Sequence, residues 1–244
     1  MSDGVTERDR VLAGEKWEFD AEVARVFDDM LARSIPQYQT MRYLTAQLVL
    51  RHLKENGARA PKLLDLGCSR GGAIADMIAY LPEDARFLGL EVSEPMVRAA
   101  RSRFAKNPNV RVRQWDLRHG LPDEANGADV ALCVLTLQFV PIEYRAKILR
   151  TVRAGMRPGG LFVLVEKVLG QSAETNAQLV ETYHATKRLA GYTDEQIERK
   201  RLSLEGVLVP ITATWNEELM ASAGFPQPEC FWRFLNFAGW IVRL

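Results

Sequence analysis

The sequence predicts an α/β protein built on a doubly wound, mostly parallel sheet of seven strands. Between residues 62 and 167, short apolar runs alternate with stretches of helical periodicity. That rhythm is typical of βαβ units, whose helices cover both faces of a parallel sheet. A glycine-rich loop follows the first apolar run, and an acidic residue ends or follows each of the next two. Because crossover connections are right-handed, these units wind into a doubly wound sheet.

The composition is that of a soluble globular protein. Of 244 residues, 47% are hydrophobic and 26% are charged, and the length suits one domain spanning residues 1–244. The 32 basic and 31 acidic residues nearly cancel, so we expect no direct nucleic-acid partner. No apolar run is long enough to span a bilayer, so we expect no membrane partner and a cytoplasmic location.

Two helices are expected before the first strand. After a polar lead-in over residues 1–16, apolar residues recur at three- and four-residue spacing over 17–33, which predicts an amphipathic helix. Pro36 ends that pattern, and a second helix is expected from about 39 to 56. Together they form an N-terminal helical segment, residues 17–57.

The central region supplies the alternating strands and helices. Strands are expected at 62–66, 87–91, 110–115, 129–134 and 161–167. Helices are expected between them at 73–81, 93–106 and 142–156. The sequence Pro158-Gly159-Gly160 predicts a turn before the fifth strand.

The alternation stops after the fifth strand. Residues 170–214 predict a helical insertion packed over the ligand-binding edge of the sheet, with helices at 173–190 and 194–204. One further helix is expected at 215–222, and a final antiparallel hairpin at the sheet edge is expected from strands 229–234 and 237–242.

The glycine loop is the first candidate for chemistry. It reads Gly67-x-Ser69-x-x-Gly72, between a predicted strand and a predicted helix. Ligands of such sheets bind at the carboxyl ends of the strands. Glu91 ends the second strand, where a carboxylate can accept hydrogen bonds from both ribose hydroxyls. A nicotinamide dinucleotide is one possible ligand of this loop, and a site without catalytic function is a second interpretation.

A third acid favours a different ligand. The order Asp65-x-Gly67-x-Ser69-x-x-Gly72, then Glu91, then Asp116 resembles the class I, Rossmann-like enzymes that use S-adenosylmethionine. That resemblance implies that the loop faces the methionine part, Glu91 the ribose and Asp116 the adenine amino group. An aspartate that accepts from an exocyclic amine is sound hydrogen-bond chemistry.

A narrower resemblance covers nearly the whole chain. Its motifs are Trp17-x-Phe19-Asp20, Arg33-Ser34-x-Pro36-x-Tyr38, Thr136-Leu137-Gln138-Phe139, Glu166-Lys167, Lys187-Arg188, Gly191-Tyr192, Lys200-Arg201 and Asn236-Phe237. In this order they resemble the carboxy-S-adenosyl-L-methionine synthase family. The resemblance implies a transferase that makes carboxy-S-adenosylmethionine from S-adenosylmethionine and prephenate, releasing phenylpyruvate, for modification of a tRNA wobble uridine by a partner enzyme.

The same resemblance implies roles for individual residues. Carried over by position, the methionine end is lined by Tyr38, Gly67, Cys68 and Ser69, the ribose by Glu91 and Val92, and the adenine by Asp116 and Leu117. Val134 would face the sulfonium or amino group through its carbonyl. Arg201 would bind the new carboxylate as the catalytic residue, reaching the site from the neighbouring subunit of a homodimer. The sequence departs from the family pattern at Glu91, Val92 and Val134.

Other interpretations stay open beside this one. An S-adenosylmethionine-dependent methyltransferase acting on a small molecule would use the insertion as a lid over its acceptor. An inactive scaffold would bind the cofactor without turning it over. The histidines and cysteines lie too far apart in the sequence for a metal site, so no metal is expected.

Overall fold

One mixed sheet carries the fold. The computed structural model describes residues 16–244, so nearly all of the predicted lead-in lies outside the described part. The strands are β1 (Lys62–Leu66), β2 (Arg86–Glu91), β3 (Val110–Gln114), β4 (Ala128–Val134), β5 (Met156–Leu169), β6 (Ile211–Thr212), β7 (Glu229–Phe234) and β8 (Phe237–Arg243). The main path runs β3-β2-β1-β4-β5-β8-β7, so the seven predicted strands are present.

The strand directions also follow the prediction. β1 to β5 pair in parallel, whereas β8 is antiparallel to both β5 and β7. The prediction missed one strand, because β6 is only two residues long and adds to β5 off the main path. The switch point lies between β1 and β4, because β2 and β3 lie on one side of β1 and β4 and β5 lie on the other. Doubly wound sheets bind their ligands at such a point.

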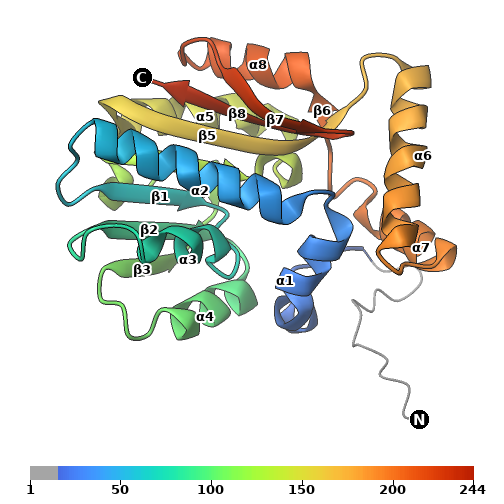
Figure 1. Cartoon of the computed structure of the whole chain (residues 1–244), viewed down its shortest axis with the longest axis horizontal. Coiled ribbons are helices and arrows are strands. Elements are labelled where there is room, and N and C mark those ends of the chain that lie inside the picture. Colours follow the sequence, from blue (N-terminus) through green and yellow to red (C-terminus); the bar gives the residue numbers. More distant parts are fainter. Residues whose placement is uncertain (1–15) are drawn as a thin grey trace.

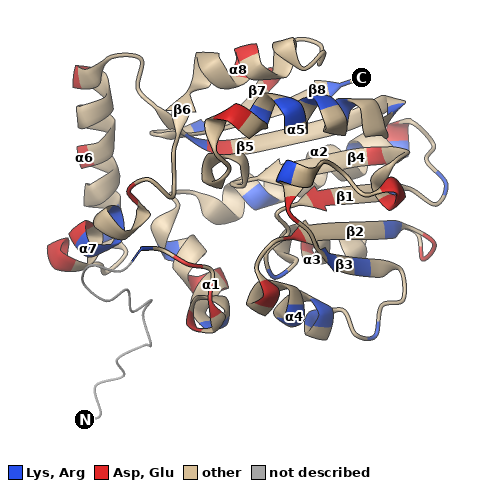
Figure 2. Ribbon diagram, turned by 180° about the vertical axis from the view of Figure 1, so that it is seen from behind, with Lys and Arg blue, Asp and Glu red and all other residues tan. Residues whose placement is uncertain are grey.

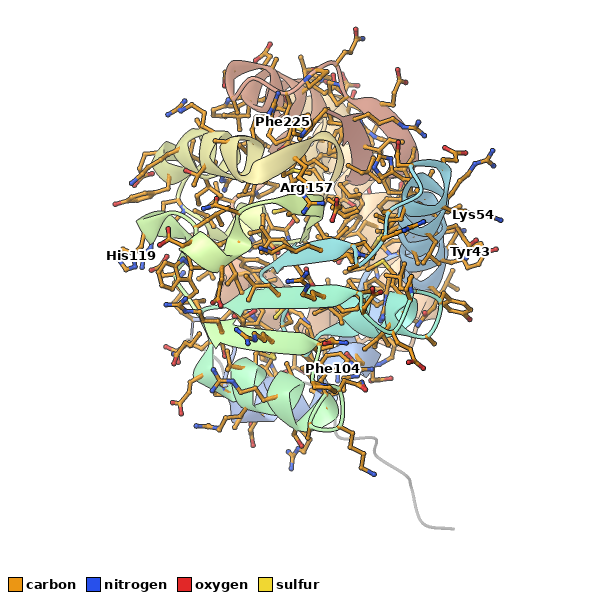
Figure 3. All side chains as sticks on the ribbon, turned by 90° about the vertical axis from the view of Figure 1, so that its left-hand side faces the viewer. Tyr43, Lys54, Phe104, His119, Arg157 and Phe225 are labelled. Carbon is orange, nitrogen blue, oxygen red and sulfur yellow. The ribbon has the colours of Figure 1, made fainter. Side chains whose placement is uncertain are left out.

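Helices cover both faces of the sheet (Figure 1). They are α1 (Ala21–Ser34), α2 (Tyr38–Glu55), α3 (Gly72–Ile78), α4 (Glu94–Arg103), α5 (Ile142–Gly155), α6 (Ala173–Leu189), α7 (Asp194–Leu204) and α8 (Ala213–Ser222). Figure 3 separates the two layers, with Tyr43 and Lys54 of α2 on one side of the sheet and His119 on the other.

Strand alternation divides the apolar residues between these two layers. In β1, Leu63 packs into the core under α2, α3 and α4, whereas Leu64 packs into the core under α5 and α8. Both side chains are almost completely buried. The sheet is therefore buried on both faces, as its near-continuous apolar strands predict.

Two local predictions were wrong. The first helix begins at Ala21, not at Trp17, because the Asp20 side chain accepts a hydrogen bond from Val23 N at 2.8 Å and caps it. Lys16 to Asp20 precede the helix without regular structure. The predicted turn at Pro158-Gly159-Gly160 lies inside β5, which starts at Met156. The chain does bend there, since residues 157–160 shift the register with β4 and Gly159 has φ +78°, but Gly159 N donates to Leu244 O at 2.9 Å and keeps the segment in the sheet.

The insertion lies beyond the carboxyl ends of the parallel strands, beside α1 (Figures 1 and 2). Several hydrogen bonds attach it there. Tyr183 Oη on α6 donates to Ser34 O at 2.8 Å, the Tyr192 hydroxyl lies 3.1 Å from Ser34 Oγ, and Trp17 N donates to Ser203 O at 3.0 Å. The insertion therefore packs over the ligand edge, as predicted. In residues 16–244, no helix combines the length and apolar character that a bilayer crossing needs.

Candidate functional site

A cavity of ≈ 490 Å³ opens at the carboxyl ends of β1, β2, β4 and β5, under α1 and the insertion. All of the predicted cofactor-binding residues except Arg201 line it: Tyr38, Gly67, Cys68, Ser69, Glu91, Val92, Asp116, Leu117 and Val134. The fold thus brings together positions that lie up to about a hundred residues apart in the sequence. Their individual roles toward a ligand stay predictions.

The glycine loop follows β1 directly and requires glycine at its first position. Gly67 has φ +69°, and a Cβ there would lie 2.4 Å from Cγ2 of Thr136. Thr136 is itself fixed, because its hydroxyl donates to Leu66 O at 2.9 Å. Any side chain at residue 67 would collide with the β4–α5 loop and fill the cavity wall.

Glu91 closes the second strand with both carboxylate oxygens engaged. Ser69 N donates to Oε2 at 2.9 Å and Ser93 N donates to Oε1 at 2.8 Å. Burial raises the pKa of Glu91, and the backbone amides of Ser93, Ser69 and Val92 oppose that rise. The carboxylate joins the glycine loop to the start of α4, and each oxygen keeps a lone pair for a ribose hydroxyl.

Asp65 is a site residue that the position-by-position prediction missed. It lies within β1, lines the cavity and is buried. Burial raises its pKa to about 7, the negative charge of Glu91 adds to the rise, and Arg42 opposes it. Its place at the head of the glycine motif was the available signal. Two neighbouring carboxyl groups give this end of the cavity an affinity for a cation.

Asp116 follows β3, which pairs with β2 on the side away from β1, and it lines the cavity there. Its carboxylate accepts from the backbone N of Arg118 at 2.9 Å and from the Arg118 Nε at 2.8 Å. These hydrogen bonds lower the pKa of Asp116, so it is an ionised acceptor at neutral pH. Val92, at 58% exposure, borders the cavity mouth next to it.

Arg201 does not line the cavity of its own chain. It lies exposed on α7, where its Nε and Nη2 donate to Glu198 at 2.8 and 2.7 Å. The preceding residue, Lys200, faces inward instead, with Nζ 4.7 Å from the centre of the Trp17 ring. Successive helical residues point about 100° apart, so only one of the two basic residues can face the cavity. The role that the resemblance implies for Arg201 therefore requires a second copy of the chain.

Three lysines line the cavity from the insertion side: Lys167, Lys187 and Lys200. They belong to the sequence motifs Glu166-Lys167, Lys187-Arg188 and Lys200-Arg201, for which the resemblance implies no role of the lysines. Burial lowers the pKa of Lys167 to about 8. Asp65 and Glu91 therefore lie at the glycine-loop part of the cavity, which Arg42 and Arg70 also line, and the three lysines line the part next to the insertion.

Glu166 fixes the loop that forms another wall of the cavity. Its buried carboxylate accepts from the backbone N of Thr136 at 3.1 Å, Leu137 at 2.9 Å and Gln138 at 2.7 Å. Burial raises the pKa of Glu166 to about 8, while Arg145 and these amides oppose the rise. Three backbone donors on one carboxylate hold the loop at the end of β4 in one position.

Comparisons with known proteins agree with this geometry. A family model described as a methyltransferase domain matches residues 63–160. The structure of human N-acetylserotonin methyltransferase in complex with SAM superposes with a TM-score of 0.57 at 15% identity, covering 91% of this chain and 55% of that chain. Fold and cavity together define a protein with the class I methyltransferase fold.

Two curated relatives narrow the class. The carboxy-S-adenosyl-L-methionine synthase of Wolinella succinogenes is 36% identical over 94% of this chain and 94% of its own. That of Chromohalobacter salexigens is 36% identical over 93% of this chain and 83% of its own. The chain belongs to the carboxy-S-adenosyl-L-methionine synthase family.

Proposed function

We propose that the protein is a carboxy-S-adenosyl-L-methionine synthase. It binds S-adenosylmethionine in the cavity and converts it, with prephenate, to carboxy-S-adenosylmethionine, phenylpyruvate and water: prephenate loses its hydroxyl group and carbon dioxide, the hydroxide takes a proton from the sulfonium methyl group, and the carbon dioxide becomes the new carboxyl group. The observation that carries the proposal is full-length similarity to curated synthases, N-terminal segment and insertion included. The lining of the cavity supports it, because Asp65 and Glu91 suit a substrate that is a sulfonium cation and the three lysines suit one that is a dicarboxylate.

The glycine-loop part of the cavity suits the S-adenosylmethionine. Glu91 would accept from the ribose hydroxyls, and Asp116, held ionised by Arg118, would accept from the adenine amine. Asp65 would face the charged amino-acid part of the ligand, next to the glycine loop that Gly67 keeps open. These residues bind and orient, so the protein contributes positioning and electrostatics to the reaction.

Arg201 would act across a homodimer. A guanidinium fork matches a carboxylate with two parallel hydrogen bonds, which suits the new carboxyl group of the product. In its own chain Arg201 is exposed and paired with Glu198. A second copy that packs its α7 against the cavity mouth would deliver the guanidinium to the partner's ligand.

The product would leave for a partner enzyme that modifies the wobble uridine of tRNA. The synthase itself would handle only small molecules, in keeping with its nearly balanced charge. A cytoplasmic location belongs to this proposal, because tRNA and its modifying enzymes reside there.

The test is mass spectrometry of the nucleoside formed when purified protein is incubated with S-adenosylmethionine and prephenate. We expect a species heavier than S-adenosylmethionine by the mass of carbon dioxide, formed in step with phenylpyruvate. Formation of neither product from a correctly folded protein would refute the proposal.

A small-molecule methyltransferase is the second candidate. It is favoured by the match to a methyltransferase domain over residues 63–160 and by the outward position of Arg201. Its signature in the same assay is S-adenosylhomocysteine, formed without prephenate once an acceptor is supplied. A third outcome, S-adenosylmethionine bound tightly and released unchanged under every condition, indicates an inactive scaffold.

A further inference from the structure

Lys167 is a half-buried cation without a counter-charge. It lies two residues before the end of β5, lines the cavity, and places its Nζ 5.0 Å from the centre of the Tyr183 ring. Across residues 16–244, its ammonium group has no hydrogen bond and no ion pair. An ammonium group that is partly withdrawn from water without an anion nearby is costly, and at a cavity wall a ligand can compensate it.

The neighbouring carboxylate cannot neutralise it. Side chains alternate across a strand, so Glu166 points to the opposite face of the sheet from Lys167. There its oxygens accept from the three backbone amides of residues 136–138. The backbone N of Lys167 donates to Gln138 Oε1 at 2.7 Å, which fixes this part of β5. The lysine is held in place, and its charge is left for the cavity.

The surroundings of Lys167 add positive charge. Lys187 Nζ lies 5.5 Å from the centre of the same Tyr183 ring. Burial lowers the pKa of His184, and the positive charges of Lys187 and Lys167 lower it further. The Tyr183 hydroxyl is already committed to Ser34 O at 2.8 Å. The Tyr183 ring therefore lies near both ammonium groups and supplies no anion to them.

Lys167 lies away from the part of the cavity that is assigned to S-adenosylmethionine. β5 lies two strands from β1 and three from β2, which places it about 10 and about 15 Å from those strands. The glycine loop and Asp65 belong to β1, and Glu91 belongs to β2. The methionine carboxylate is expected beside the loop and the new carboxylate beside Arg201. The carboxylate left to account for is that of the second substrate.

We propose that Lys167, with Lys187 on the same tyrosine ring, binds a carboxylate of the acidic second substrate and so determines its orientation in the cavity. This inference rests on the proposed function, in which that substrate is prephenate. The shared chemistry is a carboxylate held by a desolvated ammonium, and three carboxylates compete for the assignment: that of prephenate, the carboxymethyl group of the product, and the methionine end of S-adenosylmethionine.

The experiment measures binding without turnover. Prephenate is titrated calorimetrically into protein loaded with S-adenosylhomocysteine, for the wild type and for Lys167→Met. Separate titrations give the affinities of S-adenosylhomocysteine and carboxy-S-adenosylmethionine. We expect prephenate to bind about 10- to 100-fold more weakly to the variant, with the two nucleoside affinities changed less than about twofold. Lys147→Met, an exposed lysine on α5, is the matched control and leaves all three affinities unchanged.

Each other outcome overturns the assignment. An unchanged prephenate affinity removes Lys167 from that role, and so does failure of the wild type to bind prephenate. A loss confined to carboxy-S-adenosylmethionine assigns the lysine to the product's carboxymethyl group, and an equal loss for both nucleosides assigns it to the methionine end. Lys187→Met, expected to weaken prephenate binding by a smaller factor, gives the same test if Lys167→Met does not fold. The product assay above decides the synthase activity independently of these titrations.

Discussion

At the scale of single residues, the site contains ionisable groups whose burial disfavours their charged forms. Asp65 and Glu91 lie at the glycine-loop part of the cavity, and burial raises the pKa of both. Lys167 is the counterpart in the part next to the insertion, where burial lowers its pKa. Such groups destabilise the empty protein and favour ligands that supply the missing charge, which makes stability and binding oppose each other here.

Replacing Asp65 by asparagine is expected to stabilise the ligand-free protein. The pKa of Asp65 is raised from 3.8 to about 7, so between these values the folded protein holds a proton that the unfolded chain has lost. The wild-type free energy of unfolding therefore falls as pH rises through that window and stays low above it. Asparagine removes this loss, and we expect an advantage of about 4 kcal/mol at pH 8 that shrinks toward pH 4.

Urea denaturation at several pH values measures that difference. The exposed Asp84, replaced by asparagine, is the control and should track the wild type. Equal stabilities of Asp65→Asn and wild type at pH 8 would show that Asp65 carries no buried charge. The same variant should bind S-adenosylmethionine more weakly, since it lacks the anion beside the cationic ligand.

At the scale of elements, strand ends and the loops after them create the site. The β4–α5 loop lines the cavity because Glu166 of β5 holds three of its amides and Thr136 hydrogen-bonds to Leu66 O. Arg145 of α5 adds a hydrogen bond from Nε to Val140 O at 2.8 Å. One carboxylate thus organises the turn that faces the ligand.

Glu166→Gln is expected to destabilise the protein by about 2 to 4 kcal/mol. An amide presents one acceptor oxygen and turns two N–H donors toward backbone N–H groups that need acceptors. Thermal unfolding followed by circular dichroism measures the loss. The exposed Glu143, changed to glutamine, serves as the matched control, with an effect under about 0.5 kcal/mol. A Glu166→Gln melting temperature equal to that of the control would contradict the role given to this carboxylate.

Elements with strong periodic or terminal signals were predictable from the sequence, and those governed by tertiary contacts were not. β1 and α7 have the predicted bounds, because an apolar run closed by glycine and a charged helix with a threonine cap are local signals. The first helix started later than predicted because a cap at Asp20 outweighs the periodicity of Trp17 and Phe19. β6 depends on pairing with a distant strand, so nothing local announces it.

The same division applies to the site. The glycine loop and the strand-end acids follow from spacing along the chain, and the structure places them around one cavity. The inward position of Lys200 and the outward position of Arg201 depend on how α7 sits against Trp17, which motif matching does not report. The absence of an anion beside Lys167 likewise depends on the three-dimensional arrangement of its neighbours, which the sequence does not give.

At the scale of the whole molecule, the insertion and the N-terminal segment close one end of a standard sheet. The exposed guanidinium of Arg201 on that insertion makes the proposed homodimer a testable requirement of activity.

Subunit complementation tests that requirement. Arg201→Ala and Glu91→Ala are each expected to lose most synthase activity when assayed alone. Mixed under conditions that exchange subunits, they should recover about a quarter of wild-type activity, since half of the dimers are mixed and each has one intact site. Absence of recovery in mixtures shown to contain mixed dimers would place Arg201 outside the partner's site.

The ring of Tyr183 touches three parts of the chain at once. Its hydroxyl reaches Ser34 at the end of α1, its face meets the ammonium groups of Lys167 and Lys187, and its edge packs on Phe237 at 5.6 Å between centroids. Substitutions at these positions share one intermediary, so their energetic effects will not be additive. The first chain segment, the sheet and the added helices thus form one thermodynamically coupled unit, although they lie far apart in sequence.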